Sequence, residues 1–460
     1  MVVQAGSGVY WAFAAAVFFL YWACAPSPRL RLAAVLLANY TFCARFGLFY
    51  LALIPACSTL DYLAGLGLMS WKRPALRRLL AGFSVCLDLS LIAGSRYLGI
   101  LLNHGAAWDW VFPLGLSFYA FQAMTYTLDL YRRDAEGSRS LLAHLSAVSF
   151  FPTLQAGPIT RVTDLIAQMA KRPQLSREEG GRAFFLIGLG LLKKALIADF
   201  LANNLVNRVF DTPNLYSGGE ALLAVYAYSL QLYFDFSGYT DIARGTAALL
   251  GIRLPINFDR PYASANMTEF WRRWHLSFSN WLRDYLYFSL PGGRTRLMPY
   301  VNLVITMFLA GLWHGVTLPF AVWGLLHGLA LAVTRYFMAR RGRARRPSTG
   351  LRHALNVFLT YQFVCLTWIF FRSASLSTAW LMLQRIASLT FSLENVTPAF
   401  AAVLILAAAV LFLGKPWYER AAALFARSPF YVHAAALAAV AIAIQLLGGQ
   451  GSAPFVYSRF

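Results

Sequence analysis

The sequence predicts an all-α protein that crosses a membrane several times, and its composition gives two reasons. Hydrophobic residues fill 59% of the 460 positions and charged residues only 13%, whereas an ordinary soluble domain has roughly 25% charged residues. The apolar residues also gather into runs close to the roughly 20 residues that an α-helix needs to cross a bilayer. A mean hydropathy of +0.55 agrees with this fold class.

Taken in order, the apolar runs predict ten to twelve helical passes, some of which cross only part of the bilayer. We expect one membrane domain over residues 1–460. It would comprise N-terminal helices (1–60), a core bundle (61–338) that includes an interfacial helix (266–289), and C-terminal helices (352–460). The runs lie near residues 8–24, 30–57 (long enough for a bent or broken helix), 80–103, 111–130, 142–156, 183–202, 220–250, 299–318, 320–338, 354–371, 398–414 and 430–449.

The formal charge of +21 comes from short cationic clusters between the apolar runs, not from one basic domain. Such clusters are typical of cytoplasmic loops that face anionic lipid. We therefore expect a multi-pass protein of the inner (plasma) membrane that contacts membrane lipids and binds no nucleic acid. The clusters are Arg29 and Arg31, Lys72 to Arg78, Arg132 and Arg133, Lys171 and Arg172, and Arg340 to Arg346.

Neither the cysteines nor the glycines indicate a metal or a nucleotide cofactor. The five cysteines lack metal-ligand spacing and lie in or beside apolar runs, so we expect small buried apolar side chains. The run Gly188-Leu189-Gly190 lacks the third glycine of a dinucleotide-binding loop. We expect no metal and no cofactor. The cysteines are Cys24, Cys43, Cys57, Cys86 and Cys365.

The stretch 266–289 has the pattern of a basic, tryptophan-rich amphipathic helix. Asn266 and Glu269 form a capping box at its start. A helix of this kind is expected in the plane of the membrane interface, where it could serve simply as an anchor. His275 follows Trp271 by four residues and so shares the aromatic face. That face comprises Phe270, Trp271, Trp274, Phe278, Trp281, Leu282 and Tyr285.

A second histidine, His314, stands in an apolar run between Gly311 and Gly315. This small-xxx-small spacing permits close helix packing, and in one interpretation the histidine merely bonds a neighbouring carbonyl. In the other, the glycines leave room for a substrate beside a neutral imidazole, which can take a proton from a hydroxyl group.

Two aspartates lie in the apolar run 220–250, where acidic side chains are functional or paired. Arg244 follows Asp241 by three residues, which predicts a structural salt bridge. Asp235 has no partner nearby in the sequence, so its role stays open.

Several segments between about residues 60 and 375 together resemble the membrane-bound O-acyltransferase family, in particular its bacterial alginate-type polysaccharide O-acetyltransferases. Two segments depart from that pattern: Leu290-Pro291-Gly292-Gly293-Arg294 stands where Leu-Gly-Gly-Asn-Arg is usual, and Asp88-Leu89-Ser90 stands where an Asn-Leu-Gly run is expected. The matching segments are Pro113 to Tyr119 with Gln122, Phe151-Pro152 through Ala156 to Ile159, Tyr233 to Tyr239, Asn257-Phe258 with Pro261-Tyr262, Phe270 to Ser277, Trp281 to Tyr287, Gly311 to Gly315, and Phe370 to Arg372.

The resemblance implies a helical bundle with a central funnel and interfacial or re-entrant helices. It also implies that His314 is the catalytic histidine and that His275 is a second active-site histidine. We expect the substrates to be contacted by Asn257, Trp313, Trp274, Arg272, Arg273 and Asp235.

The implied reaction is transfer of an acyl group, expected to be acetyl, from a cytoplasmic thioester to an exported cell-envelope or extracellular polysaccharide. The donor would be acetyl-CoA or another acyl thioester, including one on an acyl carrier protein. A periplasmic or extracellular acyltransferase partner would complete the transfer. Alternatives within the superfamily are peptidoglycan O-acetylation and D-alanyl transfer to an envelope polymer. A transporter or lipid flippase, in which His314 and Asp235 relay protons, is the alternative from another class.

Overall fold

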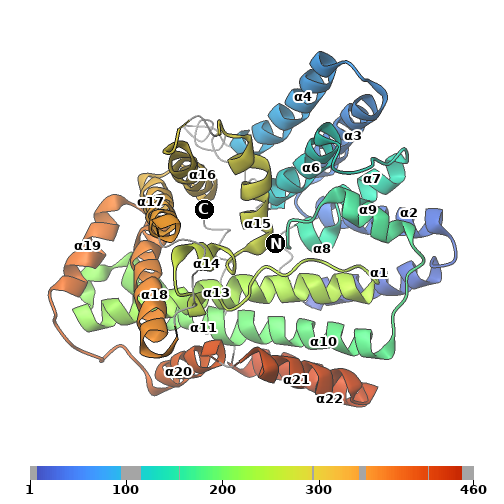
Figure 1. The fold of residues 1–460 in the computed structure, drawn as a ribbon. Helices are drawn as coiled ribbons and strands as arrows, with labels where there is room; N and C mark the ends of the chain where they lie inside the picture. Colours follow the sequence, from blue (N-terminus) through green and yellow to red (C-terminus); the bar gives the residue numbers. More distant parts are fainter. Residues whose placement is uncertain are drawn as a thin grey trace. The chain divides into compact units, whose positions relative to one another are not determined.

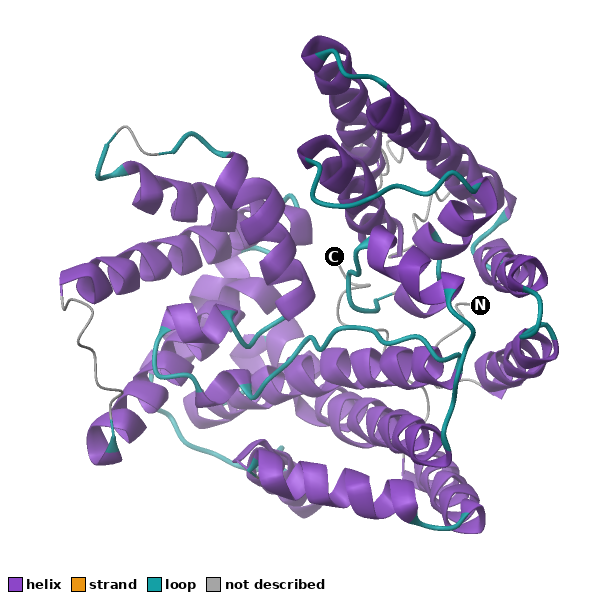
Figure 2. Ribbon diagram, turned by 45° about the vertical axis from the view of Figure 1, so that its right-hand side comes forward, coloured by secondary structure: helices purple, strands orange, loops and turns teal. Residues whose placement is uncertain are grey.

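The protein is described here from a computed structural model, which describes residues 8–94, 115–154, 156–292, 295–340, 349–412 and 414–447. Throughout these ranges every regular element is helical, and Figure 2 shows helices joined by loops with no strand between them. The all-α prediction is therefore confirmed for the described residues.

Contacts between Cα atoms divide the chain into two compact units. The first unit comprises residues 1–190, 239–255 and 422–437, and the second comprises 191–238, 256–421 and 438–460. The helices wholly or mostly in the first unit are α1 (Gly8–Ala23), α2 (Pro28–Ala44), α3 (Leu48–Ser70), α4 (Pro74–Ala93), α6 (Gly115–Arg132), α7 (Leu141–Val148), α8 (Phe151–Leu154), α9 (Val162–Ala170) and α10 (Arg177–Leu191) (Figure 1).

The second unit contains the π-helical turns η2 and η3, the helix hairpin of α16 and α17, and the helices around it. Besides α10, whose last residue lies in the second unit, the helices that contribute residues to both units are α13 (Gly218–Leu249), α21 (Lys415–Arg427) and α22 (Phe430–Leu447). The other elements of the second unit are η2 (Leu192–Ala198), α11 (Asp199–Leu201), η3 (Ala202–Val206), α12 (Asn207–Asp211), η4 (Pro213–Leu215), η5 (Pro261–Ala263), α14 (Met267–Trp271), α15 (Leu276–Trp281), η6 (Leu282–Leu286), η7 (Tyr287–Ser289), α16 (Met298–His314), α17 (Leu318–Arg340), α18 (Gly350–Arg372), α19 (Leu376–Ala387) and α20 (Pro398–Phe412).

The apolar run 30–57 is broken, as its length suggested. Ser27 caps α2 by accepting a hydrogen bond from the backbone N–H of Leu30, and Pro28 occupies the first helical turn, where a missing N–H costs nothing. Gly47 precedes α3 with φ of +117°, a conformation that disfavours any residue with a Cβ atom. The glycine therefore sets the point at which the chain turns from α2 into α3.

Fewer helices can span a bilayer alone than the apolar runs suggested. In the described ranges, α3, α17 and α18 are long and apolar enough, and a bent pair, 398–411 with 415–427, could supply a fourth span. This is fewer than the expected ten to twelve passes, because several runs are divided between short elements and because the runs 80–103 and 111–130 extend outside the described residues. The run 142–156, for example, forms α7 and α8, and the run 183–202 passes through η2 and η3.

Two members of the cationic clusters are buried instead of facing lipid. Arg31 donates hydrogen bonds to the carbonyl oxygens of Met169 and Lys171, at 2.7 and 2.8 Å, where α9 ends. Arg77 donates to Leu68 O near the end of α3 and to two carbonyls at the end of α6. Cations at these positions satisfy carbonyl groups that have no partner inside their helix.

The cysteines are free thiols. Cys43, Cys57 and Cys365 are buried as expected, whereas Cys86 is exposed, which corrects the prediction for that residue.

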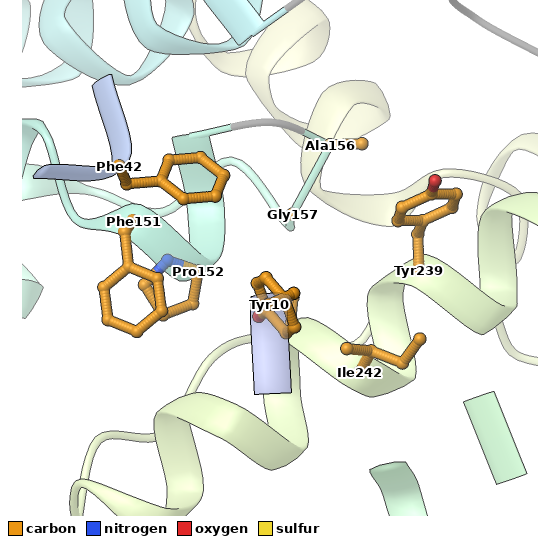
Figure 3. A pocket seen from close by; sticks show the side chains of 9 residues that line it. Tyr10, Phe42, Phe151, Pro152, Ala156, Gly157, Tyr239 and Ile242 are labelled. Carbon is orange, nitrogen blue, oxygen red and sulfur yellow. The ribbon is translucent and has the colours of Figure 1, made fainter. Parts of the chain in front are cut away.

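The first unit contains a small, partly open pocket of about 20 Å³, room for about one water molecule. Figure 3 shows Phe42, Phe151 and Pro152 on one side of it and Tyr239 on the other. Gly157 also lines the pocket, and a Cβ atom on it would overlap the carbonyl oxygen of Pro152. Only glycine therefore lets the backbone at residue 157 approach the backbone of Pro152 this closely. Phe151, Pro152 and Gly157 thus line a pocket in the first unit, whereas the two candidate histidines belong to the second unit.

Candidate active site

The candidate site is built on the hairpin of α16 and α17, two helices that lie side by side (Figure 1). A Cβ atom on Gly311 would overlap the carbonyl oxygen of Phe320 and lie 3.1 Å from the Cα of Gly324. A Cβ on Gly324 would lie 2.5 Å from Met307 O. The glycine spacing around His314 therefore serves close helix packing, as the first interpretation predicted. The space beside Gly311 is filled by α17 and is not open to a substrate.

His314 is the last residue of α16 and is only 3% exposed. Its ring lies 4.9 Å from that of Phe371 and 5.2 Å from that of Trp323, centre to centre, and the Trp323 ring stands perpendicular to it. Aromatic rings thus surround the imidazole and exclude water from much of its surface. Such a surrounding strengthens electrostatic interactions of the imidazole with a bound substrate.

His275 lies in a turn, because the stretch 266–289 is not one helix. The chain forms α14, a turn, α15, and then the π-helical turn η6 and the 3-10 turn η7. His275 stands in the turn with φ of +43° and is buried. The prediction that it continues the face of Trp271 along one helix is wrong, because the backbone reverses its twist at this residue. Burial lowers the pKa of His275 to about 3, so its imidazole is neutral.

One of the two hydrogen bonds of the predicted capping box is present at the start of this stretch, whereas the Glu269 carboxylate binds the N–H of the residue before the cap instead of that of Asn266. Asn266 Oδ1 accepts from the N–H of Glu269 at 3.0 Å, and the Glu269 carboxylate accepts from the N–H of Ala265 at 2.8 Å. The spacing of Asn266 and Glu269 therefore predicted where α14 begins, but it did not predict the break after α14.

Asn257 holds the turn that carries His275. Its side-chain oxygen accepts from the N–H of Ser277 at 3.1 Å, and its carbonyl oxygen accepts from the N–H of Leu276 at 2.9 Å. These are the first N–H groups of α15, which need partners outside the helix. Asn257 therefore fixes the direction in which His275 projects; its predicted contact with substrate stays a prediction.

The fold brings His275 and His314 to the same two aromatic rings. Phe278 lies 5.0 Å from the ring of His275 and 6.2 Å from that of His314. Trp313 lies 6.4 and 4.5 Å from the same two rings, and Phe278 and Trp313 are 4.4 Å apart. The two histidines, which lie far apart in the sequence, in the turn before α15 and at the end of α16, thus share one aromatic cluster.

The other predicted substrate contacts on this stretch divide between core and surface. Trp274 is buried against Phe258 and Trp368, at 5.1 and 5.3 Å between ring centres. Arg273 pairs with Glu269 at 2.5 Å, and Arg272 is exposed. Trp274 is therefore a buried packing residue, and of the two arginines Arg272 is the exposed one.

Asp235, whose partner the sequence did not show, forms an ion pair with Lys194 at 2.7 Å. Lys194 also contacts Asp199 at 2.6 Å, and all three groups are buried. Lys194 belongs to η2, where the π-helical turn departs from the α-helical register, and such turns often occur at functional positions. The predicted pairing of Asp241 with Arg244 is confirmed, at 3.6 Å.

Sequence reasoning missed a third buried histidine in this unit, His327 of α17. Its Nδ1 accepts a hydrogen bond from Trp271 Nε1 at 3.3 Å, and its Nε2 lies 2.9 Å from the hydroxyl oxygen of Thr367. Its ring packs 4.7 Å from Trp323, the same tryptophan that stands against His314. The signal was present in the sequence, since His327 precedes a glycine just as His314 does.

Comparison with known proteins agrees with the resemblance. The chain matches the membrane-bound O-acyltransferase family over residues 39–377. It is 35% identical to the probable alginate O-acetylase AlgI of Pseudomonas aeruginosa over 83% of this chain and 76% of that protein. The corresponding protein of Azotobacter vinelandii is 37% identical over 77% of this chain and 72% of its own length.

A relative whose name gives a different acceptor matches nearly as much of this chain as the alginate O-acetylase of Pseudomonas aeruginosa does. The peptidoglycan O-acetyltransferase of Helicobacter pylori is 31% identical over 81% of this chain and 76% of that protein. The family match includes both histidines of the aromatic cluster and the hairpin that carries His314. The chain belongs to the membrane-bound O-acyltransferase family and is a multi-pass membrane acyltransferase.

Proposed function

We propose that this chain moves an acetyl group from cytoplasmic acetyl-CoA across the inner membrane, for O-acetylation of an exported cell-envelope or extracellular polysaccharide. Similarity to two alginate O-acetylases over most of the chain supports the acetyl group and the polysaccharide. The observation on which the mechanism rests is the position of His314 at the end of α16, buried among aromatic rings beside the cluster shared with His275.

In the proposed reaction His314 acts as general base. The acceptor hydroxyl loses its proton to the imidazole as its oxygen attacks the thioester carbonyl carbon. The carbon–sulfur bond then breaks, the imidazolium returns the proton to the departing sulfur, and the products are an ester and free thiol. One positioned base of this kind contributes about 10²–10⁴-fold to the rate.

The other predicted residues would act around this step. Neutral His275 would orient the donor, and the turn fixed by Asn257 would hold it in place. Exposed Arg272 would attract the phosphates of the donor at the surface. We further propose that a periplasmic or extracellular acyltransferase accepts the acetyl group and completes the transfer to the polymer.

The central test is His314→Ala in cells that lack the native gene. Ester-bound acetate is released from the exported polysaccharide with mild alkali and measured. We expect it to fall to the level of cells without the gene, because the hydroxyl can no longer lose its proton in step with attack. His353→Ala, on the exposed start of α18, is the matched control and should leave O-acetylation unchanged.

Undiminished acetate in cells that carry His314→Ala, with the variant inserted in the membrane at normal level, would exclude the catalytic role of His314. Such a result would favour the transporter or flippase alternative.

The donor distinguishes the related reactions. Purified protein in nanodiscs, supplied with a hydroxyl acceptor, should release free thiol from acetyl-CoA. Release from a D-alanyl carrier-protein thioester instead would replace the acetyl assignment with D-alanyl transfer. If acetyl-CoA is consumed but the ester-bound acetate lies on peptidoglycan, the acceptor resembles that of the Helicobacter pylori relative.

A further inference from the structure

The sequence pattern around His314 occurs twice in the α16–α17 hairpin. Gly311 to Gly315 and Gly324 to Gly328 both read Gly-x-x-His-Gly, so His327 occupies in α17 the place that His314 occupies in α16. The first glycines of the two copies meet where the helices pack, since a Cβ on Gly311 would lie 3.1 Å from Gly324 Cα. The closely packed hairpin thus contains two buried histidines, His314 in α16 and His327 in α17.

The hydrogen bonds of His327 determine its tautomer. An indole N–H only donates, so Nδ1, which faces Trp271 Nε1, must accept and cannot carry a proton. The proton of the neutral ring is then on Nε2, which donates to Thr367 Oγ1. The Thr367 hydroxyl in turn donates to the carbonyl oxygen of Val364 at 2.8 Å. Both ring nitrogens of His327 are thereby occupied, which makes it unsuited to carry a proton in the reaction.

One aromatic side chain connects His327 to His314. The ring of Trp323 lies 4.7 Å from His327 and 5.2 Å from His314, and it meets the latter at 90°. Trp271, held by His327, packs edge to face on Trp323 at 5.9 Å. Trp323 also stacks on Trp368, at 5.9 Å and 15°. The indole of Trp323, which faces His314, therefore also packs against Trp271, the residue that is hydrogen-bonded to His327.

We propose that His327 is a positioning residue, which through Trp271 and Trp323 fixes the orientation of the His314 imidazole. This inference rests on the proposed catalytic role of His314. A histidine with a fixed tautomer is suited to this task because it joins three helices by directional bonds: α17 to Thr367 in α18, and α17 to Trp271 in α14. Misplacement of a catalytic group by 1 Å can cost about 10²-fold in rate.

The test uses a matched pair at the fully buried Thr367. Thr367→Ser keeps the hydroxyl that accepts from His327, and the nearly isosteric Thr367→Val removes it. We expect kcat for acetyl-CoA in nanodiscs to fall by at least about tenfold in Thr367→Val and to stay near the native value in Thr367→Ser. KM for acetyl-CoA should stay unchanged in both, because the donor site is not altered.

A second measurement reads the tautomer directly. Nitrogen-15 NMR of histidine-labelled protein should show one ring in the Nε2–H form, assigned by its loss in His327→Gln. His144→Leu removes a histidine that is equally buried in the first unit and serves as control for a general loss of packing. It should leave kcat unchanged.

Three results would overturn the inference: equal kcat in Thr367→Val and Thr367→Ser, an Nδ1–H tautomer for His327, or the same fall in kcat for His144→Leu. Failure of the proposed function is a separate outcome, since it would appear as full activity of His314→Ala. In the His314→Ala background, Thr367→Val should cause no further loss, because the two residues act on one step.

Discussion

At the residue scale, the basic side chains have two different roles. Arg31 and Arg77 are buried and bind carbonyl oxygens at helix ends, whereas Arg78 and Arg272 are exposed. The composition shows only that cations gather between apolar runs. Whether a given arginine satisfies backbone carbonyls or faces outward depends on which helix ends come near it.

Arg77 provides a test of the buried role. Arg77→Ala leaves Leu130 O and Tyr131 O, bound at 2.9 Å each, and Leu68 O without their cationic donor. We expect the protein to lose about 2–4 kcal/mol of stability, since hydrogen bonds to charged groups are worth more than neutral ones and the partners are buried. Thermal unfolding in detergent, followed by tryptophan fluorescence, measures the loss.

The neighbouring Arg78→Ala is the matched control and should leave the melting temperature within experimental error, because Arg78 is exposed. Equal destabilisation by both variants would show that net charge, and not the carbonyl contacts, is responsible.

At the element scale, the packing of α16 against α17 determines the position of His314. Its glycines allow the two backbones to touch, with Gly324 against Met307 O and Gly328 against Val304 Cα. Because the helices pack this closely, the end of α16 comes near α17 and the Trp323 and Phe371 rings. Helix contact of this kind depends on small residues, since apolar side chains gain little from association within lipid.

Gly324→Ala tests this packing. The added methyl group would lie 2.5 Å from Met307 O and 3.0 Å from Phe308 Cα, both backbone atoms, so the helices must separate. We expect a loss of about 1–3 kcal/mol, as for other overpacked cores, and a fall in activity because His314 moves. Thermal unfolding and the thiol-release assay measure the two effects.

Gly82→Ala in α4 is the control, since nothing lies within 4 Å of its added methyl group. It should stabilise the protein by about 0.5–1 kcal/mol, because alanine favours the helix. If Gly324→Ala behaved in the same way, the contact between the helices would not limit stability.

At the scale of the whole molecule, we expect the net charge of +21 to attract the anionic donor of the proposed reaction. Acetyl-CoA carries phosphate groups, and a strongly cationic protein attracts such a molecule from solution. This attraction is screened by salt, with a Debye length of about 10 Å at 0.1 M.

We therefore expect KM for acetyl-CoA in nanodiscs to rise with ionic strength while kcat changes little. S-acetylpantetheine, a thioester without the nucleotide phosphates, is the matched donor and should show a much weaker dependence. Arg272→Gln should reduce the dependence for acetyl-CoA, as this arginine is exposed. Equal salt dependence for both donors would mean that the phosphates are not recognised electrostatically.

Interactions between residues three or four positions apart were predictable, because helical spacing alone places such side chains together. The cap formed by Asn266 and Glu269 and the pair of Asp241 with Arg244 are of this kind. The pairing of Lys194 with Asp235 was not predictable, since it joins separate helices. The break at His275 was also missed, because the aromatic periodicity continues through it while the backbone does not.

The sequence by itself determined that the chain is a helical membrane protein of the O-acyltransferase family, and it singled out His275 and His314. Composition and motif order carry that information, since they do not depend on how helices pack. Only the tertiary structure decided that Phe278 and Trp313 contact both histidines and that His327 packs against Trp323. Contacts between distant segments are set by which helix faces meet, and that is determined by packing across the whole unit.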